Sequence, residues 1–307
     1  MPRIASDLTW LIGSTPLVEL SRLSPPTGRI VAKLESWSPT GSNKDRAVLA
    51  MIREAERAGV LPVGGTIVEC TSGDLGVSIA AIGRRLGYRV VLVMPECGQN
   101  ARVALSRALG AEIQFTPREL GMRAAIELTE ALQKRTPGAI CLQPFTSKAN
   151  AEAHASSTAL EIWNDTNGQV AVVVAAIGTG GTAAGCAMAL RDKGVKIVGV
   201  EPAASQVMRG GAAGPHDIAG IGAGFVPEIL PPRLLDEVIA VACADARAQV
   251  RRLALEEGLL CGPASGAVVT AAIEVARRSV YSGRMVVAVL PDSAEHHLDH
   301  SAFLQED

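Results

Sequence analysis

The sequence predicts an α/β fold made of two doubly wound domains whose sheets are mostly parallel. Short apolar runs rich in β-branched residues alternate with amphipathic stretches along nearly all of the 307 residues. Most of these runs are continuous, as expected of strands that are buried on both faces of a parallel sheet. Repeated strand–helix–strand units of this kind are typical of doubly wound architectures.

Nine apolar runs are expected to form strands. They occupy Arg29–Leu34, Thr66–Glu69, Arg89–Met94, Glu112–Phe115, Ala139–Leu142, Val170–Ile177, Lys196–Val200, Glu237–Val241 and Met285–Leu290. Helices are expected between them at Lys44–Ala58, Val77–Leu86, Gly121–Lys134, Ala183–Leu190 and Ala246–Glu257. We place a domain boundary near residue 145, which gives an N-terminal domain of residues 1–145 and a C-terminal domain of residues 146–307.

The composition argues against several classes of partner. The formal net charge is −2 and the basic residues are interspersed, which argues against binding to nucleic acid or an anionic membrane surface. No apolar run is long enough to span a bilayer, and the N-terminal segment lacks the apolar core of a signal peptide. The six cysteines are scattered without a C-x-x-C pair, as expected of reduced, mostly buried thiols in the cytoplasm.

The first chemically suggestive segment is Pro39–Arg46 (PTGSNKDR), which follows an expected strand and leads into an expected helix. Lys44 therefore lies at or near a helix N-terminus. Helix-end potential and burial both lower a lysine pKa, as a Schiff-base lysine requires. Taken alone, a solvated lysine in the first helical turn is the more frequent interpretation.

A second segment, Ile177–Thr182 (IGTGGT), lies between the most apolar expected strand and another helix. Small residues allow backbone N–H groups to close around a phosphate at a helix N-terminus, so this loop is a better candidate for a phosphate site than for a plain tight turn. A dinucleotide fingerprint would require glycine at Ala183, and the sequence contains no Walker A motif.

A third segment, Glu69–Gly76 (ECTSGDLG), also joins a strand to a helix. Its hydroxyl groups and exposed amides suit a substrate carboxylate, and they suit simple helix capping equally well. Near the C-terminus, Glu295–His300 (EHHLDH) resembles a metal cluster. Because no second cluster completes it, we interpret this segment as a solvated turn and expect no metal site.

Taken together, these segments resemble the cysteine synthase (O-acetylserine sulfhydrylase) family of pyridoxal phosphate (PLP) enzymes, which have the fold called type II, similar to the tryptophan synthase β subunit. The agreement runs in order along nearly the whole chain. It comprises Ile12–Leu17, Ala32–Glu35, Gly41–Arg46, Thr71–Gly73, Met94–Glu96, Glu161–Trp163, Gly178–Thr182, Val200–Pro202, Gly220–Phe225, Glu257–Gly258 and Leu290–Ser293.

The resemblance implies roles for individual residues. Lys44 is expected to bind PLP covalently and to act as the catalytic residue. The expected cofactor contacts are Lys44, Asp74, Gly178, Thr179, Gly180, Gly181, Thr182 and Ser265. The expected substrate contacts are Thr71, Ser72, Gly73, Leu75, Gln143 and Gly222. The resemblance also implies a homodimer and allows residues up to about 35 to pack on the second domain.

Several positions depart from the family pattern, and they concern the cofactor ring and the substrate carboxylate. Asp74 stands where the family has an asparagine beside the ring hydroxyl, and an ionised aspartate cannot donate a hydrogen bond there. Leu75 and Pro144 replace residues of the carboxylate site. Ala264 replaces the serine expected at the pyridine nitrogen, with Ser265 one residue further on, and Gln99 replaces another serine.

These observations predict PLP-dependent β-replacement on an activated L-serine, O-acetylserine or O-phosphoserine, through an α-aminoacrylate. Because the departures cluster around the ring and the carboxylate, we expect a nucleophile other than sulfide or an altered substrate. The alternatives are PLP-dependent β-elimination with deamination, and a binding protein of this family that has lost catalysis. A nicotinamide-binding oxidoreductase is disfavoured by Ala183 and leaves Lys44 without a role.

Overall fold

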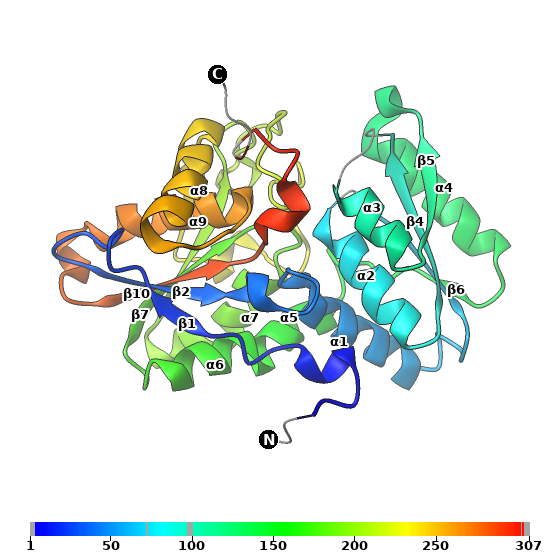
Figure 1. The fold of residues 1–307 in the computed structure, drawn as a ribbon, viewed down its shortest axis with the longest axis horizontal. Helices are drawn as coiled ribbons and strands as arrows, with labels where there is room; N and C mark the ends of the chain where they lie inside the picture. Colours follow the sequence, from blue (N-terminus) through cyan, green and yellow to red (C-terminus); the bar gives the residue numbers. More distant parts are fainter. Residues whose placement is uncertain (1–3, 72, 97–100, 302, 304–307) are drawn as a thin grey trace.

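The computed structural model describes residues 4–71, 73–96, 101–301 and 303, and the strands among these residues form two sheets (Figure 1). The larger sheet has the order β1 (Leu17–Glu19), β2 (Arg29–Leu34), β10 (Met285–Leu290), β7 (Val170–Ala176), β8 (Lys196–Pro202) and β9 (Glu237–Val241). The smaller sheet has the order β5 (Glu112–Thr116), β4 (Arg89–Pro95), β3 (Thr66–Cys70) and β6 (Ala139–Ile140). All pairings are parallel except β1 with β2, which confirms the predicted fold class.

Helices flank both sheets. The smaller sheet is accompanied by α1 (Lys44–Arg57), α2 (Asp74–Arg85), α3 (Ala101–Ala108) and α4 (Gly121–Arg135). The larger sheet is accompanied by α5 (Lys148–Ser156), α6 (Thr158–Asp165), α7 (Gly181–Leu190), α8 (Cys243–Glu257) and α9 (Pro263–Ala276). Among the described residues, no helix is both long enough and apolar enough to cross a membrane.

Each of the nine predicted strands is present, with small differences at the ends. Strand β8 runs two residues longer than predicted, and β6 stops two residues earlier, at Ile140. Beyond β6, the N–H groups of Leu142 and Gln143 donate to the Glu69 carboxylate instead of to a strand. The short strand β1 was not predicted, because three residues carry too little periodicity. Strand β2 lies between β1 and β10 and pairs with both, and the boundary proposed near residue 145 stays a prediction.

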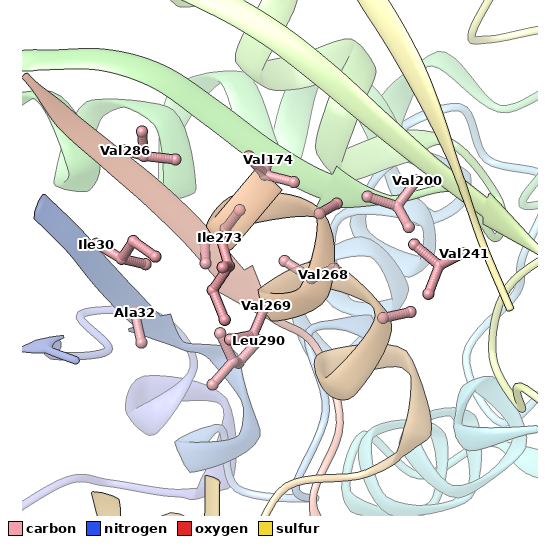
Figure 2. Close-up of a cluster of buried hydrophobic side chains, with 14 of the residues drawn as sticks. Ile30, Ala32, Val174, Val200, Val241, Val268, Val269, Ile273, Val286 and Leu290 are labelled. Atoms are coloured by element: carbon pink, nitrogen blue, oxygen red, sulfur yellow. The ribbon is translucent and has the colours of Figure 1, made fainter. Parts of the chain in front are cut away.

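The larger sheet is buried on both faces. One face packs against α9, where the side chains of Val268, Val269 and Ile273 meet those of the sheet (Figure 2). The other face packs against α6 and α7. Since both faces are covered, its central strands need continuous apolar sequence, and β10 is buried at every position.

The smaller sheet has the same layered plan. Helix α1 places Val48, Met51 and Ile52 on one face, at the spacing of an amphipathic helix, and this face joins a core with α2, β3 and β4. The opposite face of the sheet contacts α4. In Figure 1 the two layered units lie side by side, and α1 (blue) lies below and between them.

A buried ionic network holds the start of α1. The Arg46 guanidinium contacts the carboxylate of Glu35 at 2.7 Å through Nε and that of Glu161 at 2.7 Å through Nη1. Lys33 Nζ lies 2.7 Å from Glu161 Oε2, and the Thr15 hydroxyl donates to Glu35 Oε1. Several of the motifs noted in the sequence thus meet here, and Lys44 lies two residues from Arg46.

Candidate active site

Parallel strand order places one group of loops at the carboxyl edge of the larger sheet. Strand β7 has β10 on one side and β8, its successor after α7, on the other, so the connections diverge from this point. Ligands of open α/β sheets bind at such switch points. The loop Gly178–Thr182 follows β7 there, and Pro291 and Asp292 follow β10.

Lys44 is the first residue of α1, and it lies at this edge. Its Nζ donates to Asn43 Oδ1 at 2.6 Å. Lys44 keeps part of its surface exposed, but the protein packed around its amine lowers its pKa. The carboxylates of Asp74, Asp292 and Glu35 oppose this effect without overcoming it. A lysine with a lowered pKa is more readily a neutral nucleophile.

The structure brings Lys44 together with the predicted phosphate loop in one pocket. This pocket is lined by Asn43, Lys44, Ala176, Gly178, Thr179, Gly180, Gly181, Thr182, Gly220 and Pro291. The first turn of α7 adds N–H groups that have no partner within the helix. The pocket therefore combines an amine with an anion-binding helix N-terminus.

Two glycines of the loop are required by close packing. A Cβ on Gly178 would lie 2.3 Å from the backbone oxygen of Gly220, and one on Gly181 would lie 1.9 Å from Asn150 Oδ1. Gly180 has a φ of 89°, in the left-handed region. Side chains at these positions would strain or fill the loop, so its glycines serve its shape.

Sequence reasoning missed three residues that hold the loop hydroxyl groups. Asn43 Nδ2 donates to Thr182 Oγ1 at 2.9 Å, and Asn150 Nδ2 donates to Thr179 Oγ1 at 3.0 Å. His154 Nε2 lies 3.4 Å from Thr182 Oγ1, and burial lowers the pKa of His154 well below its ordinary value. Only Asn43 stands in a motif. The other two gave no signal, because their partners are distant in sequence.

The predicted carboxylate loop lies at the start of α2. Thr71 is buried, and its Oγ1 accepts a hydrogen bond from the N–H of Gly73 at 3.2 Å. Gly73 is the N-cap of α2 and the helix has no side-chain cap. Leu75 is buried in the core that α2 shares with α1. Ser72 lies outside the described residues, as does Gln99.

The remaining predicted substrate contacts lie on two loops. Gln143 is exposed and has a φ of 54°, and its N–H donates to the buried carboxylate of Glu69. Burial raises the pKa of Glu69 to about 7, although three backbone N–H groups oppose this effect. Gly222 donates its N–H to Ile177 O at 2.9 Å, which places its loop beside the end of β7.

Ser265 lies in the first turn of α9, fully buried. Its hydroxyl and N–H both donate to Asp292 Oδ1, at 2.5 and 2.9 Å, and the N–H of Ala264 donates to Asp292 Oδ2 at 3.0 Å. Asp292 thus caps α9 from the strand β10 side. Burial raises the pKa of Asp292.

The interpretation of Glu295–His300 as a solvated turn is wrong for two of its histidines. The short helix η8 (Ala294–His297) buries His296 and His297, which are 3% and 1% exposed. His296 Nδ1 lies 3.1 Å from Asp74 Oδ1. The prediction failed because the segment itself does not show its partners. Asp74 lies more than 200 residues away in sequence, and Asp292 lies just after the end of β10.

The comparisons with known proteins agree with this geometry. The family model described as "Pyridoxal-phosphate dependent enzyme" matches residues 8–292. Cysteine synthase A of Escherichia coli K12 is 40% identical over 314 residues, covering 99% of this chain and 97% of that protein. The crystal structure of cysteine synthase from Entamoeba histolytica is 36% identical with a TM-score of 0.95, covering 100% of this chain and 94% of that one.

A second solved structure, O-ureido-L-serine synthase, is 33% identical with a TM-score of 0.94, covering 99% of this chain and 97% of that one. These matches extend along both sheets and include the loops of the site. They confirm the resemblance noted in the sequence. The chain belongs to the family of pyridoxal-phosphate-dependent enzymes, in the branch of the cysteine synthases.

Proposed function

We propose that the protein catalyses β-replacement on an activated L-serine, with PLP bound covalently to Lys44. The observation that carries the proposal is the pocket in which the Lys44 amine and the loop Gly178–Thr182 face each other. Such a pocket pairs the two groups needed for PLP, a nucleophilic amine and a phosphate site.

The residues present fit the cofactor. The phosphate would be held by backbone N–H groups of Gly178–Thr182 and by the hydroxyl groups of Thr179 and Thr182, which Asn150 and Asn43 hold in place. The glycines leave no side chain in the cradle. Around the ring we assign Asp74 and Ser265, through the first turns of α2 and α9.

When bound, PLP supplies an electron sink for the substrate α-carbon. The protein then has to orient the amino acid and move protons. We assign the transfer of the α-proton to the Lys44 amine, since its lowered pKa keeps it available as a base. Thr71, Ser72, Gly73, Leu75, Gln143 and Gly222 are assigned to the substrate side of the site.

The substrate is proposed to be O-acetylserine or O-phosphoserine, and the nucleophile one other than sulfide. The proposal of a changed specificity is supported by Leu75, because a leucine side chain offers no hydrogen bond to a substrate carboxylate. Pro144 likewise has no N–H to donate. The chain is also similar to O-ureido-L-serine synthase, which is named after a β-substituted alanine other than cysteine. This similarity supports a nucleophile other than sulfide.

The visible absorption spectrum tests this proposal. We expect the purified protein to show the band of PLP bound to lysine, and the band to shift when O-acetylserine or O-phosphoserine is added. K44A should lose the band, whereas K148A, which removes an exposed lysine from α5, should keep it. A spectrum unchanged by every activated serine would overturn β-replacement.

The products separate the main alternative. β-Replacement yields a new amino acid when a nucleophile is supplied, whereas β-elimination with deamination yields pyruvate and ammonia.

We also propose a homodimer, from the family resemblance, and a cytoplasmic location. The described cysteines form no disulfide, which is in keeping with a reducing compartment.

A further inference from the structure

Four buried ionisable side chains meet where the two layered units face each other. Asp74 begins α2, Asp292 follows β10, and His296 and His297 lie on η8. His296 Nδ1 is 3.1 Å from Asp74 Oδ1, and His297 Nε2 is 3.8 Å from the same oxygen and 3.5 Å from Asp292 Oδ2. In Figure 1 the C-terminal segment (red) reaches this place beside α3.

This cluster lies beside the pocket of Lys44, because Asp292 directly follows Pro291, which lines that pocket. The charges of Asp74 and Asp292 both act on the Lys44 amine. The cluster therefore belongs to the surroundings of the pocket rather than to a separate part of the protein. Buried carboxylates at such a place need a counter-charge, because an unpaired buried charge is costly.

A metal ion could provide that counter-charge, since the ligand atoms of Asp74, Asp292 and His297 all lie within 4.8 Å of one another. The hydrogen bonding argues against it. Arg102 Nη1 lies 3.3 Å from His297 Nδ1, and a guanidinium can only donate, so Nδ1 is the acceptor. Neutral His297 then carries its proton on Nε2, toward the carboxylates, and has no lone pair there for a metal.

His296 provides the alternative counter-charge. Burial lowers its pKa, but the hydrogen bond and charge of Asp74 raise it above its ordinary value, and Asp292 acts in the same direction against Arg102. Burial raises the pKa of the Asp74 carboxyl, but His296 and His297 together outweigh this and hold it below its ordinary value. Asp74 and His296 thus form a hydrogen-bonded pair in which each favours the charged form of the other, whereas His297 Nε2 lies 3.8 Å from Asp74 without a hydrogen bond.

We propose that η8 completes the cofactor site, and that the Asp74–His296 ion pair takes the place beside the PLP ring oxygen that a neutral asparagine takes in the family. This rests on the assignment of PLP to Lys44. An unpaired Asp74 carboxylate would repel the ring oxygen, whereas the Asp74–His296 ion pair as a whole carries no net charge. His296 acts through Asp74 and is a positioning residue.

Three variants test the charge logic. In H296N, Asp74 keeps its charge but loses its hydrogen-bonded histidine, so PLP should bind the apo-enzyme roughly tenfold more weakly or worse at pH 8. In D74N and in the double variant D74N/H296N, the position is neutral, so the dissociation constant should return to within about threefold of the wild type. H300N is the matched control, because it removes a histidine of the same segment whose Nε2 contacts Asp217 O.

If His296 only filled space, the double variant D74N/H296N would not recover the affinity for PLP. A second readout needs neither cofactor nor turnover. The imidazole NMR signals of the apo-enzyme should include one with a raised titration midpoint that H296N removes. D74N should lower that midpoint by about one pH unit or more. If H296N fails to fold, H296Q assigns the signal and its shift in D74N decides the matter.

Three results would overturn the proposal. They are an unchanged PLP dissociation constant in H296N, no recovery in the double variant, and an imidazole midpoint that D74N leaves in place. Stoichiometric Zn²⁺ in the purified holoenzyme, lost in D74N, would also overturn it, because the metal would then be the counter-charge. None of these measurements uses the β-replacement reaction, so that function can fail while the ion pair stands.

Discussion

At the scale of single residues, partners rather than burial alone decide the charge of each buried group. Protein packs around the Lys44 amine and the Glu69 carboxyl is buried, and in both cases desolvation prevails, lowering the pKa of the amine and raising that of the carboxyl. Asp74 is equally enclosed, but its histidines reverse the direction. The chemistry of the site therefore depends on hydrogen bonds that cross between elements.

Glu69 gives a prediction for pH dependence. Its pKa is 4.5 as a reference and about 7 in the fold, so between these values the folded state binds more protons than the unfolded state. Its protonation therefore favours the fold at low pH, and this contribution is lost as pH rises through 7, by about 3 kcal/mol in all. E69Q should remove that loss.

The free energy of unfolding of the wild type and of E69Q, measured by denaturant titration at pH 5 and pH 8, checks this. The difference between the two proteins should move in favour of E69Q by up to about 3 kcal/mol on going to pH 8. A difference that does not change with pH would show that Glu69 titrates at its ordinary value.

At the scale of elements, helix termini organise the site. Helices α1, α2, α7 and α9 all begin at it, and they bring Lys44, Asp74, the phosphate loop and Ser265 respectively. Small residues in these first turns let the helices approach other backbone or side chains closely. Such places tolerate added volume poorly.

The start of α7 gives a prediction of this kind. Alanine usually favours a helix over glycine, but G181A would press its Cβ against the Asn150 amide, with an expected cost of about 1 to 3 kcal/mol. N150A alone loses the bond to Thr179. In the double variant N150A/G181A the crowding is gone, so it should be no less stable than N150A.

Thermal unfolding of the four proteins, with PLP retention measured beside it, gives the double-mutant cycle. Additive losses in stability would mean that Gly181 and Asn150 do not crowd each other. The predicted pattern is a strong positive coupling, in which removing the Asn150 side chain rescues G181A.

At the scale of the whole molecule, a buried ionic network ties the two layered units together. Arg46 on α1 contacts Glu35 after β2 and Glu161 on α6. Burial raises the pKa of Glu161, but Arg46 and Lys33 outweigh this and bring it to about 2. The stabilisation from Glu161 is therefore present above pH 4.5 and is lost as pH falls toward 2.

Replacing Arg46 with an uncharged side chain leaves the buried carboxylate of Glu35 and the partly buried one of Glu161 without their main partner. R46M should destabilise the protein by about 3 to 5 kcal/mol at pH 7, and by less at pH 4, where carboxyl groups can take up protons. R53M, which breaks an exposed pair with Glu56 on the same helix, should cost at most about 1 kcal/mol. Denaturant unfolding at both pH values measures each.

A loss in R46M as small as that in R53M would show that the network is dispensable. PLP retention should fall together with stability in R46M, because the network lies directly behind the start of α1 that carries Lys44. Retention unchanged in a destabilised protein would separate the network from the site.

The local patterns of the sequence determined the α/β class, most strand positions, Lys44 at a helix start and the glycine loop after β7. These follow from apolar periodicity and short motifs, which act within a few residues. The same patterns could not reveal Asn150 and His154, or the network of Arg46. They act through contacts with residues 28 to 115 positions away in the chain.

Only the tertiary structure decided the burial and the partners of the C-terminal histidines His296 and His297. By sequence they stand in a short polar segment near the chain end, and such segments are usually solvated. Folding brings them against Asp74 and Asp292 and buries all four side chains together. A sequence determines which groups can ionise, whereas their charge in the fold depends on partners and solvent access that exist only once distant segments have packed.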